Sequence, residues 1–221
     1  ISLRVCLRTL RAITLPLRSM CRLNGLAAQS CQFMLASGVT SMRSWTILAI
    51  CCATFCSAAD ANAQEADRKE AATDESRHVE KDGGFSFVAP EGWTVREFPG
   101  QKYQIVFGPV ENQFASNINV VEEAYTGTVD NYLKATKELL PKAIKKYRLI
   151  KQEPFKTTEG IKTQRLIIEG EQQGHLLRQA FYLFPSPTKM FVVTCSTVSA
   201  GGEKLDVTFE SSMKTFRFEK K

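Results

Sequence analysis

Residue types that could carry catalysis are few and widely spaced in this chain. Of the seven cysteines only Cys195 follows residue 56, and the two histidines are His78 and His175. Cys195 served by His175 would form a thiol nucleophile with its base, because adjacent strands can bring distant positions together. Cys195 lies in an apolar stretch between Val193 and Val198, however, where an inert buried thiol is expected. We therefore predict no cysteine catalysis.

The signatures of common enzyme classes are absent from the sequence. It has no G-x-S-x-G nucleophile elbow, H-E-x-x-H zinc motif, paired C-x-x-C or phosphate-binding glycine loop. Two separate histidines do not supply clustered metal ligands. The adjacent Glu122 and Glu123 point to opposite faces of a predicted strand, so they cannot act as one acid–base pair. The sequence predicts a protein that is not an enzyme and that uses no cofactor or metal.

Two segments are candidates for a contact surface. In one, Phe114 stands among polar residues in a predicted loop, and Phe98 and Gln101 lie one hairpin away; the alternative is that Phe114 turns inward and caps the core. In the other, a basic run shares the polar side of a predicted helix, which is either a solvated face or a contact for anionic lipid, wall polymer or an acidic protein. The candidate residues are Phe98, Gln101, Phe114, Lys142, Lys145 and Lys146.

The first 63 residues resemble an export leader. Met42 and Arg43 precede an apolar run over Thr46–Ala59, and the small residues that follow predict signal-peptide cleavage between Ala63 and Gln64. The apolar run is shorter than the roughly 20 residues that a spanning helix needs. We therefore expect a periplasmic or secreted protein.

The leader leaves three alternatives open. Residues 1–41 are either an upstream extension of the reading frame or a transit peptide, which would direct the protein to a thylakoid lumen. A lipid anchor on Cys51 or Cys56 would need a small preceding residue, whereas Ile50 and Phe55 stand there. Residues 64–82 are polar, and we expect a disordered tether before a domain over residues 83–219.

The net charge of +6 belongs mostly to the leader. Residues 1–63 hold six arginines and one acid, whereas residues 64–221 hold 23 basic and 22 acidic residues. A nearly neutral exported domain is not expected to bind nucleic acid.

Hydrophobic periodicity predicts an α+β domain. Alternation of two predicts strands and a period of 3.6 predicts helices, one of them capped by Thr128 and kinked or divided at Pro141. Short turns between the strands predict an antiparallel sheet, with the Phe191–Thr194 run at its centre. The expected strands are Phe85–Phe87, Trp93–Phe98, Tyr103–Phe107, Asn117–Glu123, Arg148–Thr157, Ile161–Glu171, Leu176–Phe184, Met190–Val198 and Phe216–Phe218, and the expected helices are Val129–Tyr147 and Glu203–Lys214.

The order of several short motifs resembles the PsbP/DcrB-like family over nearly all of residues 83–219. These are FSFVAPEGW from Phe85, the Ser116–Val120 strand, the helix beginning near Tyr132, the Glu159–Gly160 hairpin and Phe209–Phe218. The resemblance implies an antiparallel sheet flanked by helices, an α/β/α sandwich, in an exported or lumenal protein. It implies no catalytic residue. The chain looks more like bacterial secreted members of unknown function than like plant PsbP, which assists the oxygen-evolving photosystem.

We therefore expect an exported, non-enzymatic protein that binds an extracytoplasmic protein partner or assists an envelope or membrane complex. One alternative is a small-ligand binder with a pocket between sheet and helix. More remote alternatives are a PsbP-like photosystem accessory protein of the thylakoid lumen and an unrecognised hydrolase. Fold analogy alone assigns none of these functions.

Overall fold

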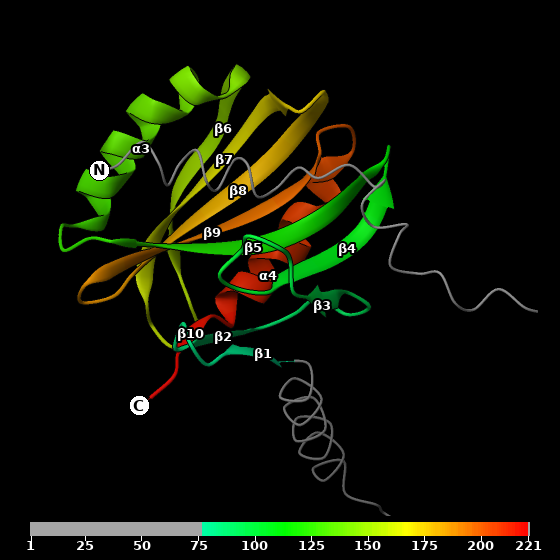
Figure 1. Cartoon of the computed structure of the whole chain (residues 1–221). Helices are drawn as coiled ribbons and strands as arrows, with labels where there is room; N and C mark the ends of the chain where they lie inside the picture. Colours follow the sequence, from blue (N-terminus) through cyan, green and yellow to red (C-terminus); the bar gives the residue numbers. More distant parts are fainter. Residues whose placement is uncertain (1–76, 221) are drawn as a thin grey trace, which may run out of the picture.

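The structure is a computed structural model that describes residues 77–220 (Figure 1). The predicted leader, its cleavage site between Ala63 and Gln64, and residues 64–76 of the predicted tether lie outside the described residues. Within the described part, no helix is both long enough and apolar enough to cross a membrane.

Strands make up most of the described chain, and two α-helices interrupt them. The elements in chain order are β1 (Arg77–Glu80), β2 (Phe85–Val88), β3 (Thr94–Arg96), β4 (Ile105–Glu111), β5 (Phe114–Ala124), α3 (Val129–Ala143), β6 (Lys145–Lys156), β7 (Lys162–Gln172), β8 (His175–Pro185), β9 (Lys189–Val198), the 3₁₀-helix η2 (Gly202–Leu205), α4 (Asp206–Lys214) and β10 (Arg217–Phe218). Each predicted strand and helix has a counterpart here.

The strands form two antiparallel sheets. The main sheet has the order β3-β4-β5-β9-β8-β7-β6, and a small sheet has the order β1-β2-β10. Strand β9 lies in the middle of the main sheet, where Cys195 pairs with Ile118 of β5 and with Ala180 of β8. This confirms the central position predicted for the apolar run in β9. The α+β class, with an antiparallel sheet flanked by helices, is also confirmed.

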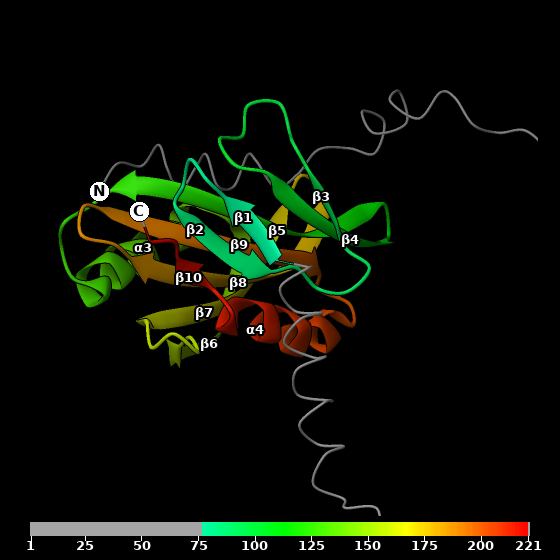
Figure 2. The same ribbon diagram turned by 90° about the horizontal axis from the view of Figure 1, so that it is seen from below.

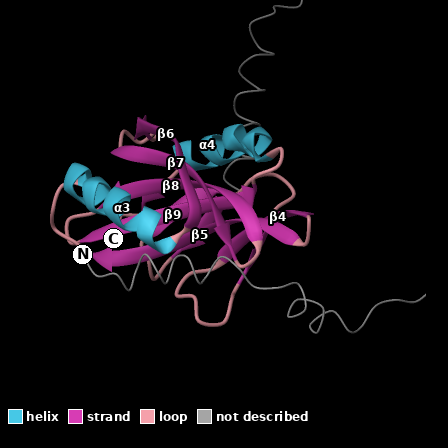
Figure 3. Ribbon diagram, turned by 90° about the horizontal axis from the view of Figure 1, so that it is seen from above, coloured by secondary structure: helices cyan, strands magenta, loops and turns pink. Residues whose placement is uncertain are grey.

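Different elements cover the two faces of the main sheet. The small sheet and α4 lie on one face (Figure 2), and α3 lies on the other (Figure 3). The core under the small sheet is aromatic, and the rings of Phe184 and Phe216 stack there with centroids 3.9 Å apart. The core under α3 is formed by aliphatic and aromatic side chains of α3, β7, β8 and β9.

Helix α3 begins and ends for identifiable reasons. The side chain of Thr128 accepts a hydrogen bond from the backbone N–H of Asn131, which confirms the predicted N-cap. The helix ends at Ala143, two residues after Pro141, because Ile144 is extended and the chain enters β6 at Lys145. The division into two helices expected as one outcome at Pro141 is wrong, since Pro141 lies within the last turn of one helix.

Gly170 of β7 allows the end of α3 to approach the sheet. A Cβ atom at Gly170 would lie 2.1 Å from Cγ2 of Ile144 and 3.3 Å from the carbonyl oxygen of Lys145. The first distance is too short for a real carbon contact and the second is tight, so a side chain at Gly170 would push the end of α3 away from β7.

The helix predicted over Val129–Tyr147 ends four residues earlier, at Ala143, because the chain there enters β6. Two other predicted segments also differ from the structure. Residues 77–80, assigned to a tether, form β1 and pair with β2, and His78 is buried. The sequence signal was weak because Arg77–Glu80 contains only one large aliphatic residue. The loop predicted around residues 108–116 is a tight hairpin instead, in which Asn112 and Gln113 adopt positive φ angles of 49° and 63°. Two positive φ angles are typical of a type I′ turn.

Candidate functional site

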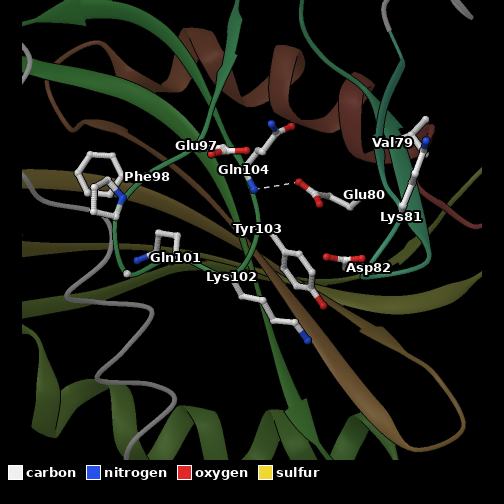
Figure 4. Close-up of a pocket in the computed structure, with 12 residues that line it drawn as sticks. Val79, Glu80, Lys81, Asp82, Glu97, Phe98, Gln101, Lys102, Tyr103 and Gln104 are labelled. Atoms are coloured by element: carbon white, nitrogen blue, oxygen red, sulfur yellow. Dashed lines mark hydrogen bonds between the residues drawn. The ribbon is translucent and has the colours of Figure 1, made fainter. Parts of the chain in front are cut away.

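The described residues form a solvent-open hollow beside the small sheet, with a volume of about 910 Å³. One wall is the end of β1 and the turn after it, and the other is the segment between β3 and β4. Figure 4 shows Val79 and Phe98 at opposite sides of this hollow. Its lining residues are Val79, Glu80, Lys81, Asp82, Glu97, Phe98, Pro99, Gly100, Gln101, Lys102, Tyr103 and Gln104.

Two tight turns give the hollow its shape. After β1, the backbone N–H of Gly84 donates to the carbonyl of Glu80 at 2.8 Å and closes the first turn. In the second wall, the N–H of Gln101 donates to the carbonyl of Phe98 at 3.0 Å, and Gly100 has a φ of 82° that glycine adopts without strain.

A half-buried carboxylate beside the hollow holds two of its lining residues in place. Glu122 of β5 accepts hydrogen bonds from Tyr103 Oη at 2.6 Å, from Lys189 Nζ at 2.9 Å and from Lys102 Nζ. Burial by itself would raise the pKa of Glu122, but the three donors outweigh it and lower the pKa to about 2. Burial, followed by the contact with Glu122, raises the pKa of Tyr103. Lys102 and Tyr103 are thus held in one arrangement.

Glu80 links the two walls. Its Oε1 accepts a hydrogen bond from the backbone N–H of Gln104 at 2.9 Å, drawn as a dashed line in Figure 4. The same oxygen lies 3.2 Å from Nε2 of His78, whose ring packs edge-on against Phe87 with centroids 5.2 Å apart. Burial lowers the pKa of His78, against the opposing effect of Glu80. His78 is therefore a structural anchor for β1.

The side chains that line the hollow carry more negative than positive charges. Its lining includes the carboxylates of Glu80, Asp82 and Glu97 and the ammonium groups of Lys81 and Lys102. Lys102 is already paired with Glu122, which lies below the lining. The carboxylates do not converge, since no group of three or more His, Cys, Asp or Glu residues in residues 77–220 is placed to hold a metal ion. The lining presents charged groups and the aromatic rings of Phe98 and Tyr103.

Two of the predicted contact residues line this hollow, and a third is misplaced. Phe98 and Gln101 are part of the lining. Phe114 is only 5% exposed and packs with Leu177 and Val198, so the interpretation of Phe114 as an exposed contact residue is wrong. The tight hairpin turns its ring inward, which is the alternative that the sequence had left open.

The basic run is arranged differently from the prediction. Lys142 lies in the last turn of α3, but Lys145 and Lys146 belong to β6, so the three do not share a helix face. The reason is that Lys145 pairs with Glu171 of β7 in the sheet register. Lys146 Nζ also forms an ion pair with Glu171 at 2.7 Å. Glu171 of β7 therefore lies beside these lysines, and they do not form a continuous positive face.

The Cys195–His175 pair does not assemble. Cys195 is fully buried in the core under the small sheet, and burial raises the pKa of its thiol. His175 lies at the β7–β8 turn, with its ring 5.9 Å from that of Phe114. Glu122 and Glu123 face opposite sides as predicted, because Glu123 accepts a hydrogen bond from Tyr132 of α3.

Sequence reasoning identified residues in one wall of the hollow, between β3 and β4, but none in the other wall, at the end of β1. Glu80 and Asp82 were assigned to the tether, and Tyr103 was interpreted only as a strand residue. A signal was present in the paired acids on either side of Lys81, which precede a Gly-Gly turn and a Phe-x-Phe strand.

No family model and no curated protein sequence matches the chain. Its fold is similar to that of cyanobacterial PsbP from Synechocystis sp. PCC 6803, with 15% identity, a TM-score of 0.48, and 64% of this chain and 91% of that chain covered. The predicted resemblance is confirmed as one of fold. LpqN of Mycobacterium tuberculosis, described as involved in cell envelope biogenesis, has 13% identity and a TM-score of 0.48 over 62% of this chain and 83% of its own. PA94 of Pseudomonas aeruginosa, a protein of unknown function, has 16% identity and a TM-score of 0.45 over 58% and 99%. Such likeness assigns no role to any residue.

Proposed function

We propose that this protein is an exported, non-enzymatic binding module whose hollow holds a basic segment of an extracytoplasmic protein partner. The observation that carries the proposal is the acidic lining of the hollow beside the half-buried ring of Phe98. An aromatic ring next to carboxylates suits a lysine or arginine side chain, because the carboxylates pair with its charge and the ring packs against its aliphatic stem.

Charge complementarity favours a basic partner. Asp82 and Glu97 are exposed in the hollow, and no described side chain forms an ion pair with either of them. Of the two lysines in the lining, Lys102 is held by Glu122. An arriving cationic segment therefore meets carboxylates whose charge is available. Such complementarity steers association and selects against acidic partners.

The rigidity of the hollow supports recognition of a protein segment. The donors around Glu122 hold Lys102 and Tyr103, and Glu80 holds Gln104. A surface that is already ordered loses less conformational entropy when its partner binds. These same residues are poor candidates for catalysis, because the raised pKa of Tyr103 disfavours its action as a base.

The predicted leader supports an extracytoplasmic location for this binding. A signal peptide cleaved after Ala63 would deliver the domain to the periplasm or the medium, where an envelope or membrane complex is the expected setting. The N-terminal residue of the protein isolated from its host tests this part of the proposal. A start at Gln64 supports it, and retention of residues 42–63 in the isolated protein contradicts it.

Site-specific photo-crosslinking tests the proposed function. A photoreactive amino acid replaces Gln101 in the hollow, and the matched control replaces Gln152, which is exposed on β6. We expect one adduct from position 101 and none from position 152, with the crosslinked peptide rich in lysine and arginine. An acidic crosslinked peptide, equal adducts from both positions, or no adduct from position 101 would contradict the proposal.

A further inference from the structure

Strand β1 forms one edge of the small sheet. In the order β1-β2-β10 its only neighbour is β2, and no strand within residues 77–220 pairs with its outer side. Val79 of β1 is 45% exposed and lines the hollow, where Figure 4 shows it on the wall opposite Phe98. The outer edge of β1 therefore borders the hollow.

The hydrogen bonds on the far side of β2 show which way its backbone groups point. The backbone N–H of Glu219 donates to the carbonyl of Gly84 at 2.9 Å, and the N–H of Val88 donates to Oγ1 of Thr215 at 2.8 Å. The even-numbered residues in and beside β2 thus point their backbone groups towards β10 and the chain around it. In an extended strand this direction alternates, so the odd-numbered residues of β2 point their backbone groups towards β1.

The strand register then locates the outward backbone groups of β1. Phe85 of β2 pairs with Glu80. Two residues along, Phe87 pairs with His78. The backbone groups of Glu80 and His78 are therefore directed at β2, and those of Val79 between them are directed outward, along the edge that borders the hollow. An extended segment can pair with both the N–H and the C=O of Val79 without displacing any strand of the small sheet.

The other sheet edges are less suited to this kind of pairing. The main sheet ends at β3 and β6, and the small sheet ends at β10. Strand β6 contains Pro154, which has no N–H, and its register with β7 shifts twice. Proline and bulges protect a sheet edge from added strands. Strands β3 and β10 have only three and two residues. By contrast, β1 pairs with β2 at four consecutive positions without a shift.

The two faces of β1 indicate which side chains an added segment should carry. Side chains directly opposite each other in a sheet lie on the same face. A residue opposite Val79 lies beside an exposed aliphatic side chain, so an apolar residue suits this position. The next residue lies on the face of Glu80. This face is turned towards the other wall of the hollow, because Phe85, which is opposite Glu80, packs edge-on against Tyr103 with centroids 5.1 Å apart. A lysine or arginine there meets the carboxylate of Glu80.

We propose that the partner's basic segment binds as an extended strand that pairs with the outer edge of β1 and alternates apolar with basic residues. This inference rests on the function proposed for the hollow and adds how the segment is held. Backbone hydrogen bonds to Val79 supply affinity, and the alternating side chains supply specificity. The free edge is short, so the pairing covers about three residues of the segment, or about 10 Å. A second copy of this chain fits less well, because its own β1 edge carries the same carboxylates.

Calorimetry with synthetic peptides tests the inference. The probe is the peptide Lys-Val-Lys-Val-Lys-Val-Lys with blocked ends, titrated into the full chain, and we expect saturable binding. Methylation of the three valine amide nitrogens removes the donors that face β1 in the proposed pairing. Methylation of three lysine amide nitrogens is the matched control, because these groups face away from β1. We expect the first methylated peptide to bind at least tenfold more weakly than the second.

Val79→Pro tests the same pairing from the side of the protein. Proline removes the outward N–H and obstructs the edge, but this N–H is not used in the pairing with β2, so β1 can remain in the sheet. Val79→Thr is the matched control, because it keeps the N–H and the branched shape of the side chain. We expect at least tenfold weaker binding of the unmethylated peptide to Val79→Pro and little change for Val79→Thr. If Val79→Pro fails to fold, the methylated peptides decide the matter.

Three results would overturn the inference. The first is that the unmethylated peptide does not bind. The second is that the two methylated peptides bind equally, or that Val79→Pro binds like the wild type, while Asp82→Lys with Glu97→Lys weakens binding. The segment then lies in the hollow without pairing, so this inference fails and the proposed function stands. The third is a dimer of the free chain that Val79→Pro dissociates, since the edge then holds a second copy. Loss of the crosslink from position 101 would instead contradict the proposed function itself.

Discussion

Replacing Glu122 by glutamine tests the electrostatic core of the hollow. Glutamine keeps the size of the side chain and an oxygen that can accept from Tyr103, but it removes the charge that Lys102 and Lys189 neutralise. The substitution therefore isolates the contribution of charge to the free energy of unfolding.

The magnitude follows from the pKa of Glu122. This pKa is lowered from 4.5 to about 2, and each pKa unit corresponds to about 1.4 kcal/mol. The ceiling is thus about 3.5 kcal/mol. We expect about 2 kcal/mol, because the side chains of Lys102 and Lys189 are 53% and 40% exposed and water partly screens their charges. A depressed folded-state pKa stabilises the protein above pH 4.5, and this contribution is lost as the pH falls towards 2.

Urea unfolding at pH 7, 5, 3 and 2 measures this effect. We expect Glu122→Gln to lower the free energy of unfolding by about 2 kcal/mol at pH 7 and the difference from wild type to shrink towards zero at pH 2. Other carboxylates with lowered pKa values, such as Glu210, contribute equally to both proteins. Glu111→Gln, at an exposed hairpin position, is the control and should change little. A loss under about 0.5 kcal/mol at pH 7, or an undiminished difference at pH 2, would refute the reasoning.

Further predictions concern the core and the helix. Phe114→Ala should lower the free energy of unfolding by about 3 kcal/mol, because it leaves a cavity beside Leu177. Capture of the partner should not change. Unchanged stability in urea would show that the ring is not buried. Cys195 should react with iodoacetamide only after unfolding, as mass spectrometry can follow, and rapid labelling of folded protein would contradict its burial. Thr128→Ala should cost about 1 kcal/mol through the lost N-cap, measured by thermal unfolding, with Thr126→Ala as an exposed control that should not reproduce the loss. Gly170→Ala should destabilise more than a cap substitution because the added carbon would meet Ile144, and a melting temperature equal to that of wild type would argue against the close approach.

The main sheet could be predicted from the sequence because its strands are long and their turns are marked. Strands β7, β8 and β9 lie within about two residues of their predicted bounds, since Gly160, Gly174 and Pro187 punctuate them. The end of α3 could not be predicted. The apolar stripe continues through Ile144 and Tyr147, but pairing of β6 with β7 removes these residues from the helix, and such tertiary pairing overrides local periodicity.

The candidate sites were less visible than the fold. Phe98 and Gln101 were found because an aromatic residue beside a Pro-Gly turn is a local signal. Strand β1 was not predicted, because it is stabilised by pairing with β2 and by burial of His78. Both are tertiary contacts, and the composition of the segment gives no sign of them. The pairing of Asn119 with Thr194 could not be predicted for a similar reason, because these residues lie far apart in the sequence and meet only through the register of β5 and β9.

The most direct test of the proposed function is the affinity of the crosslinked partner for charge-reversed protein. Asp82→Lys with Glu97→Lys reverses the exposed carboxylates of the hollow, and Glu111→Lys with Glu159→Lys makes the same change of net charge at exposed positions outside the lining. Calorimetry with the partner's basic segment measures the dissociation constant for both variants. We predict at least a tenfold weaker affinity for the first variant and near wild-type affinity for the second. Equal affinities for the two variants would contradict binding in the hollow.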